Sequence, residues 1–390
     1  MRRIYMDANA TTPLLPEVFE AMRPYFLEQF GNASSIHLRG QQARSAVERA
    51  RASVASLLNC RPAEVVFTSG GTEGDNLALF GMLHAGDHLI TSSVEHHAVL
   101  HGAERLQGRG VAVTFLPVDS QGLVDPDHLR KALRPTTKLV SVMTANNETG
   151  VIQPIAEIGK IAAEADVYFH TDAVQAAGKI PLNVQALGCD LLTIAGHKVY
   201  GPQGVGALFV RRGTPLEPTQ VGGAHERRRR AGTENVAAIV AFGKAAEYAL
   251  SSLEKGEPER LQKLRDTLEH GLLAAIDETG VNGGLAPRVW NTSNLWFDHL
   301  EGEALVIALD LKGLAVSGGA ACASGSTEPS HVLRAMGVDT QRARASLRLS
   351  LLQQATQEEI DAVLNLIPAE VKRLRALSPA YGDRAAFSHR

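Results

Sequence analysis

The sequence has few cysteines, no long apolar stretch and no excess of charge of one sign. It holds three cysteines in 390 residues, an odd and sparse count that rules out a disulfide framework. No apolar run of about 18 residues occurs, so we expect no membrane partner. The formal charge is −3, whereas proteins that coat nucleic acids usually carry a clear basic excess. We therefore expect no direct contact with nucleic acid.

Targeting and metal-binding patterns are also scarce. The first residues, MRRIYMDANATT, soon turn polar, from which we expect no signal peptide and a cytoplasmic protein with reduced thiols. No CxxC pair occurs, and we expect no metal site despite the 14 histidines. The hydrophobic fraction of 44% is typical of a folded globular protein. Because single cores stop growing near ~250–300 residues, the length predicts more than one domain.

Short β-rich runs alternate with helix-like stretches over the first half of the chain. The expected strands are 65–68, 88–91, 111–116, 138–144, 167–171, 191–195 and 205–210. Several are nearly continuous apolar runs, as in strands that are covered on both faces. The alternation predicts an α/β fold with a mostly parallel, mixed sheet. In such sheets ligands bind beyond the carboxyl ends of the strands.

The pattern changes after about residue 240. Leucines at helical spacing fill 261–272, and a capping box, Thr356-x-x-Glu359, opens a second helix in which Pro368 is expected to cause a kink or an interruption. Residues 289–297 and 347–351 resemble strands. We predict a smaller α+β domain, so that residues 16–257 form a large cofactor-binding domain. Residues 1–15 and 258–390 form the small domain.

Three polar features follow expected strands. Residues 69–76 (SGGTEGDN) follow the first strand and offer a glycine-rich anion site, although a plain turn with Thr72 as helix cap fits equally well. Asp172 and Lys198 follow two later strands. A lysine at a strand end is usually a surface residue, but a desolvated lysine is a nucleophile toward carbonyls. Together the three features match what pyridoxal 5'-phosphate needs: a Schiff-base lysine, a carboxylate for the ring nitrogen and a phosphate site.

These residues lie in strings that resemble the cysteine desulfurases, class V enzymes of the fold-type I group that depends on pyridoxal phosphate. The matching strings occur in family order through both predicted domains. They are YMDANATT (5–12), GNASSIH (31–37), FTSGGTEGDN (67–76), VEHHAVL (94–100), NNETGVIQPI (146–155), FHTDAVQ (169–175), GHKVYGP (196–202), HERRRRAGTENV (225–236), SGGAACASGSTEPSHVLRAMG (317–337) and RLSL (348–351).

The resemblance implies a role for each of four residues around the cofactor ring. Lys198 would bind the cofactor covalently, and Asp172 would pair with its pyridine nitrogen. Gln175 would hydrogen-bond its phenolic oxygen. His96 would stack on the ring and assist proton transfer.

The resemblance also implies how the phosphate is held. Gly71, Thr72 and His197 would bind it from the same chain. Thr233 would reach the phosphate of the other subunit, which makes a homodimer part of the site. Ala195 replaces a serine that contacts the phosphate in many relatives, so one hydrogen bond is expected to be missing.

The resemblance also implies which residues bind the substrate and which cysteine is the catalytic thiol. Asn147 and Arg348 would bind the carboxylate of L-cysteine, for which a guanidinium fork is well suited. Cys322, in a run of small residues that is typical of an exposed loop, would be the catalytic thiol. Cys60 and Cys189 are interpreted as structural, because free cysteines are usually buried.

The function implied is conversion of L-cysteine to L-alanine, with the sulfur passed as a Cys322 persulfide to an acceptor. The acceptor would be a protein, either an iron–sulfur cluster scaffold or a sulfur carrier such as those used in tRNA thiolation. Three alternatives stay open: a selenocysteine lyase, another class V enzyme such as an aminotransferase, and a sulfur-delivery subunit with little activity alone. The run 351–354 (LLQQ) departs from the family pattern and leaves the local pocket wall in question.

Overall fold

The computed structural model describes residues 3–318 and 328–377. Among these residues, seven strands form the main sheet in the order β2-β8-β7-β6-β5-β3-β4. The strands are β2 (Val65–Thr68), β3 (His88–Ser92), β4 (Ala112–Leu116), β5 (Thr137–Ser141), β6 (Tyr168–Asp172), β7 (Leu191–Ala195) and β8 (Gly206–Val210). Strand β8 pairs antiparallel with β2 and β7, and the other pairs are parallel. The predicted α/β fold with a mostly parallel, mixed sheet is confirmed.

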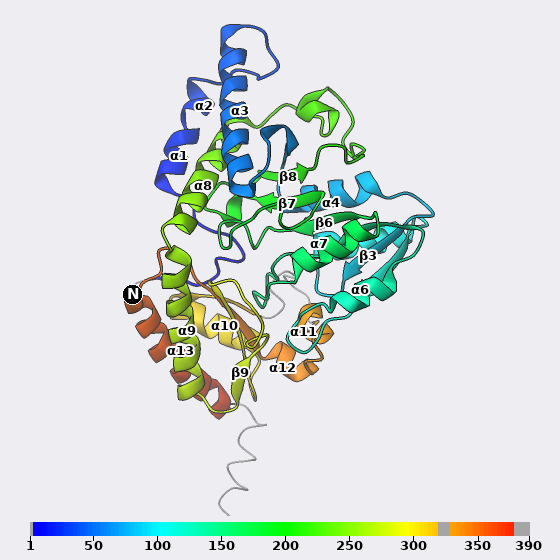
Figure 1. Ribbon diagram of the computed structural model, residues 1–390. Coiled ribbons are helices and arrows are strands. Elements are labelled where there is room, and N and C mark those ends of the chain that lie inside the picture. The colour runs from blue at the N-terminus through cyan, green and yellow to red at the C-terminus, as the bar shows by residue number, and fades with distance from the viewer. Residues whose placement is uncertain (1–2, 319–327, 378–390) are drawn as a thin grey trace, which may run out of the picture.

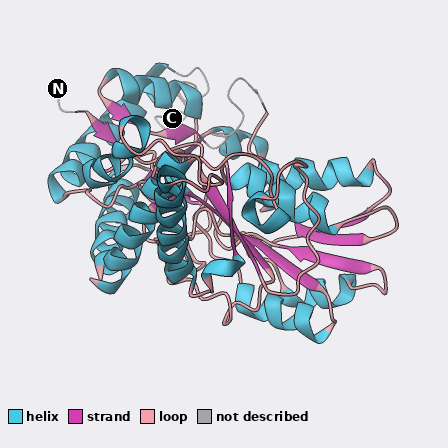
Figure 2. Ribbon diagram, turned by 90° about the horizontal axis from the view of Figure 1, so that it is seen from above, coloured by secondary structure: helices cyan, strands magenta, loops and turns pink. Residues whose placement is uncertain are grey.

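Helices cover both faces of this sheet, as Figure 2 shows. They include α1 (Pro16–Met22), α2 (Pro24–Leu27), α3 (Leu38–Leu58), α4 (Gly71–Met82), α5 (His97–Gln107), α6 (Pro126–Ala132), α7 (Ile155–Glu164) and α8 (Val236–Glu254). Neighbouring residues in one strand, such as Leu191 and Leu192, belong to different buried clusters. Successive side chains of a strand point to opposite faces, so an apolar run fills two cores at once.

Helix α8 is the one described helix that is long and apolar enough to cross a membrane. Within its most apolar window, 56% is buried inside the protein, and α3 packs against it. Because a core helix has the same composition, α8 is weak evidence for a membrane span.

A second group of elements lies at one end of the molecule, where α9 and α13 run side by side (Figure 1). It contains α9 (Glu257–Ala275), β9 (Thr279–Val281), β10 (Thr292–Phe297), α10 (Gly302–Leu311), β11 (Leu314–Ala315), β12 (Ser317–Gly318), α11 (His331–Ala335), α12 (Thr340–Arg344), β13 (Ser346–Ser350) and α13 (Gln357–Leu377). Strands β12-β13-β10-β9 form an antiparallel sheet with its own apolar core. Helix α13 continues through Pro368, so the proline does not interrupt it.

The N-terminal segment joins the two groups. Strand β1 (Ile4–Tyr5) pairs in parallel with β11, and Met6 lies in the core of the second group. A few residues on, the Thr12 amide donates to the His197 carbonyl at 3.0 Å, beside the large sheet. The segment therefore crosses between the two groups close to the end of β7.

Candidate active site

A cavity of about 300 Å³ lies at the carboxyl ends of β6 and β7. Nine of the residues predicted from the sequence line it: Gly71, Thr72, His96, Asn147, Asp172, Gln175, His197, Lys198 and Arg348. Thr233 is exposed and lines a different cavity beside Ser69 and Gly204. Cys322 falls within residues 319–327, outside the part of the chain that the structure describes.

Lys198 ends a short 3₁₀ segment, Gly196–Lys198, that directly follows β7. Its Nζ donates to the backbone carbonyls of Asn9 at 2.5 Å and Ala10 at 2.6 Å. The ammonium group is therefore held against the N-terminal segment at the edge of the cavity.

The first turn of α4 also faces the cavity. A Cβ atom on Gly71 would lie 2.9 Å from the Val174 Cγ2, so glycine permits the close approach of this turn to the loop after β6. The first amides of a helix lack partners within it and favour an anion. With the Thr72 hydroxyl nearby, the turn has the groups that a phosphate requires.

Two buried carboxylates lie at the floor of the site. The Asp172 Oδ1 accepts a hydrogen bond from the Val174 amide at 2.9 Å. Burial raises the pKa of Asp172 to about 6, although Val174 and the charge of Lys198 act in the opposite direction. Asp75, on α4, is fully buried, and its Oδ1 accepts no hydrogen bond among the described residues, although the His170 Nε2 lies 3.6 Å from it. Burial and the charge of Asp172 raise the pKa of Asp75 well above its ordinary value.

The same two carboxylates and a ring nitrogen of His96 lie within 4.8 Å of one another. This group could also offer ligands to a metal ion, which the sequence prediction of no metal site did not foresee. Lys198 lines the same cavity, however, and its Coulombic effect reaches both Asp172 and His96. The nearby ammonium group makes the site less favourable for a cation.

His96 is the N-cap of α5, and its Nδ1 accepts from the Ala98 amide at 3.1 Å. Burial, followed by the charges of His97 and Lys198, lowers the pKa of His96 to about 4. The ring is therefore neutral at pH 7 and carries its proton on Nε2. The His197 ring is also neutral at pH 7, because burial and the charge of Lys198 lower its pKa to about 4.

Arg348, in β13, brings a cation from the second group of elements. Its side chain is 2% exposed, and Nη2 donates to the Asp7 Oδ1 at 2.8 Å. Its Nη1 donates to the Asn147 carbonyl at 3.0 Å. The Nε is buried without a partner among the described residues. The two bonds thus fix the guanidinium plane at the cavity.

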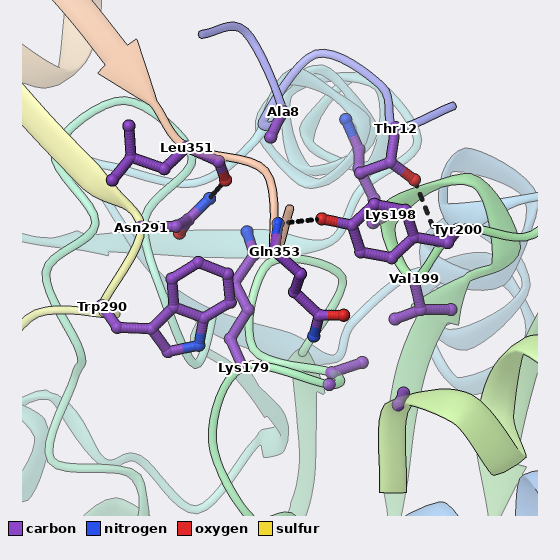
Figure 3. Close-up of a pocket in the computed structure, with 13 residues that line it drawn as sticks. Ala8, Thr12, Lys179, Lys198, Val199, Tyr200, Trp290, Asn291, Leu351 and Gln353 are labelled. Atoms are coloured by element: carbon purple, nitrogen blue, oxygen red, sulfur yellow. Dashed lines mark hydrogen bonds between the residues drawn. The ribbon is translucent and has the colours of Figure 1, made fainter. Parts of the chain in front are cut away.

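Residues 351–354, which departed from the expected pattern, do not line this cavity. Leu351 and Gln353 instead line a second cavity of about 10 Å³, which Lys198, Lys179 and Trp290 also line (Figure 3). Ala195, the other departure, does line the larger cavity.

Asn9 and Asp75 are lining residues that received no role from the sequence. Both lie in quoted strings, YMDANATT and FTSGGTEGDN, so their position in a motif was the available signal. His97 and His101, one helical turn apart, form a further cluster with His331, with ring centroids 4.9 and 4.8 Å from that of His97. The spacing of His97 and His101 in the sequence (HAVLH, 97–101) is the signal that indicates this cluster.

Comparison with known proteins agrees with this geometry. Residues 4–363 match the family model described as aminotransferase class-V. A cysteine desulfurase IscS from Dictyoglomus turgidum is 49% identical over 382 residues, which cover 97% of this chain and 97% of that protein. The chain belongs to the cysteine desulfurases of the class V family.

Solved structures extend the comparison to three dimensions. One described as a NifS-like protein has a TM-score of 0.89 and 36% identity, and the match covers 96% of this chain and all of that chain. Another, described as SspA in complex with cysteine, has a TM-score of 0.79 and 34% identity over 89% of this chain and 98% of that chain. The fold-type I assignment is confirmed.

Proposed function

We propose that this protein removes sulfur from L-cysteine with pyridoxal 5'-phosphate as cofactor, releases L-alanine and passes the sulfur on as a Cys322 persulfide. The observation that carries the proposal is that nine residues from distant parts of the sequence line one cavity. They include an amine, a carboxylate, an amide, a helix N-terminus and a guanidinium group. This set supplies one chemical partner for each part of the cofactor and for an amino-acid carboxylate.

The cavity fits the cofactor in its chemistry. Lys198 would bind it covalently, and Gly71, Thr72 and His197 would hold its phosphate. Asp172 would accept from the ring nitrogen, while Asp75 beside it stays protonated because two buried carboxylates at this distance do not both ionise. When bound, the cofactor withdraws electrons from the α-carbon of an amino acid.

The chain's own residues would then orient the substrate and move its protons. Arg348 and Asn147, which both line the cavity, would bind the substrate carboxylate. Lys198, once released, would take the α-proton. His96, neutral with its proton on Nε2, would act first as a hydrogen-bond donor in the cavity. This tautomer makes His96 a better donor to the substrate or the ring than a base toward a thiol.

Sulfur transfer would use Cys322. Its thiolate attacks the substrate sulfur, so that a sulfur–sulfur bond forms as the carbon–sulfur bond breaks. Cysteine plus the Cys322 thiol thus gives alanine plus the Cys322 persulfide, and atoms balance without an added oxidant. An acceptor protein, an iron–sulfur scaffold or a sulfur carrier, would then take the outer sulfur. We place this chemistry in the cytoplasm, where thiols are kept reduced.

A homodimer would complete the site, because Thr233 lies outside its own chain's cavity. Large apolar side chains of the N-terminal region are mostly exposed and offer a surface that a second copy can cover: Phe26, Leu27, Phe30, Ile36 and Leu38. Mixing Lys198→Ala with Thr233→Ala protomers tests this arrangement. If Thr233 acts across the interface, each mixed dimer holds one native site and regains activity. If it acts within its own chain, no site is native.

The proposed reaction is tested by adding L-cysteine to the purified protein with a thiol reductant and measuring alanine and sulfide. Equal amounts of the two products are expected. Parallel assays with L-selenocysteine distinguish a cysteine desulfurase from a selenocysteine lyase, because the lyase would act on selenocysteine alone. Turnover that appears only after an acceptor protein is added would favour the sulfur-delivery subunit. Absence of both products in every arm would refute the proposed reaction.

We also propose that residues 16–257 form a large domain and that residues 1–15 and 258–390 form a small one. Separate apolar cores support this division. The break between α8 and α9 at Lys255 and Gly256 lies beside the proposed boundary.

A further inference from the structure

Lys179 is a buried lysine that the proposed reaction does not use. It lies four residues after Gln175, in the turns that follow β6, and only 5% of it is exposed. Its Nζ donates to the Gln175 Oε1 at 2.6 Å and to the Asn9 Oδ1 at 3.0 Å. Both acceptors are neutral amide oxygens. A buried lysine without a carboxylate at these contacts is costly, which indicates that it has a purpose beyond packing.

The first contact determines which way the Gln175 amide points. A lysine amine in contact with Oε1 donates to it, and the amide nitrogen on the other side donates to the Asn9 carbonyl at 2.9 Å. A flipped amide would place its nitrogen against the Lys179 donor and its oxygen against the Asn9 carbonyl. Both contacts would then be repulsive. The network therefore presents the NH₂ group of Gln175, which lines the cavity, as the donor.

The second contact acts on Asn9. The Asn9 carbonyl accepts from both Gln175 and Lys198, so its position sets where these two groups lie. The Asn9 side chain is fixed between Lys179 and Asn291, whose Nδ2 donates to the Asn9 Oδ1 at 3.0 Å. Removing Lys179 would leave this oxygen with one donor instead of two.

Lys179 and Lys198 also influence each other's protonation through their charges. Burial, followed by the charges of Lys198 and Arg348, lowers the pKa of Lys179 well below its ordinary value. The Coulombic interaction is mutual, so a charged Lys179 also disfavours a positive charge at Lys198. The two lysines line the same small cavity (Figure 3).

We propose that Lys179 is a positioning residue, which orients the Gln175 amide as a donor toward the cofactor's ring oxygen and, through Asn9, fixes the place of Lys198. The inference depends on the proposed function, since it assumes that the cofactor binds at Lys198. It assigns Lys179 no contact with the substrate.

The test is a spectroscopic pH titration of the cofactor-loaded protein. The absorption band of the lysine-bound cofactor changes as the nitrogen that joins it to Lys198 loses its proton. Lys179→Met keeps the length of the side chain but removes the donor. Loss of the donor favours the protonated form, so the midpoint should rise by about one pH unit relative to wild type. Lys244→Met, at an exposed lysine on α8, is the matched control and should not move the midpoint.

A double-mutant cycle separates positioning from general destabilisation. If part of the effect of Lys179 passes through Gln175, Lys179→Met should raise the midpoint less in the Gln175→Ala background than in the wild-type background. Additive shifts, or an unmoved midpoint in Lys179→Met, would overturn the inference. Should Lys179→Met not fold, Lys179→Leu, which also removes the donor, takes its place with the same criteria. A wild-type protein without a cofactor band would instead refute the proposed function.

Discussion

Asp172 and Lys198 reach one cavity from the ends of adjacent parallel strands: Asp172 is the last residue of β6, and Lys198 lies three residues beyond the end of β7. This relationship explains how a carboxylate and an amine separated by 26 residues serve one ligand. The pairing of β6 with β7 brings both groups to the same edge of the sheet.

Replacing Lys198 should abolish covalent attachment of the cofactor. We expect Lys198→Ala to lose the absorption band of the lysine-bound cofactor and to lower turnover by about 10²- to 10⁴-fold, since proton transfer loses its base. The measurement is a visible spectrum with an alanine assay. A band that persists in Lys198→Ala would place the attachment at another lysine.

The three cysteines should behave differently. Burial raises the pKa of the Cys60 and Cys189 thiols to about 12, so both stay protonated and unreactive. We expect Cys322→Ala to bind L-cysteine but release no sulfide with a reductant, while the control Cys60→Ala keeps wild-type turnover. Normal sulfide release by Cys322→Ala would exclude a Cys322 persulfide.

Arg348 should contribute mainly to substrate binding. A lysine in its place keeps the charge but loses the planar fork that contacts Asp7 and Asn147. Loss of one charge-assisted hydrogen bond predicts an increase of about 10- to 100-fold in KM for L-cysteine. Steady-state kinetics of Arg348→Lys measure it. An unchanged KM with a lower kcat would mean that Arg348 acts on the reaction and not on binding.

The buried carboxyl of Glu95 predicts a pH-dependent stability. Its Oε1 accepts from the Ser92 hydroxyl at 2.6 Å and the Met143 amide at 2.9 Å, yet burial raises its pKa from 4.5 to about 8. The folded state therefore holds this proton more tightly than the unfolded state. The resulting stability is complete below pH 4.5 and is lost as pH rises through 8.

Glu95→Gln cannot lose that proton, so the variant should gain stability relative to wild type as pH rises. The difference in the free energy of unfolding should grow by on the order of a few kcal/mol between pH 5 and pH 9. Urea unfolding at several pH values measures it. A difference that does not vary with pH would show that Glu95 is ionised throughout.

Much of the fold could be predicted from the sequence, because apolar runs and helical stripes report burial directly. Strand 65–68 was placed correctly at both ends, as was 191–195. The capping box at Thr356 marked the start of α13, where the Glu359 amide donates to the Thr356 hydroxyl. Pro368 was misjudged in part: α13 packs on α9 and on the second core, and this tertiary packing maintains a helix that local propensity opposes.

The site was predictable only where a side chain lies in a recognisable motif. Asp172 and Lys198 follow strands, and a parallel sheet brings such residues together. Lys179 carried no such signal, because its importance arises from contacts with Asn9 and Gln175 that require the folded chain. The raised pKa of Asp75 was equally hidden, since it depends on burial in the folded chain and on a second carboxylate nearly 100 residues away.

The pairing of β1 with β11 has a consequence for the order of events during synthesis. Tyr5 pairs with Ala315, so the first strand cannot reach its native neighbour until more than 300 further residues have been made. At usual rates of translation this takes roughly 15–60 s. The side chain of Asn9 also lacks its native partners until then, because Asn291 and Thr292 are synthesised late. All strands of the large sheet have therefore been synthesised before the N-terminal segment, which completes the binding site, can meet its native partners.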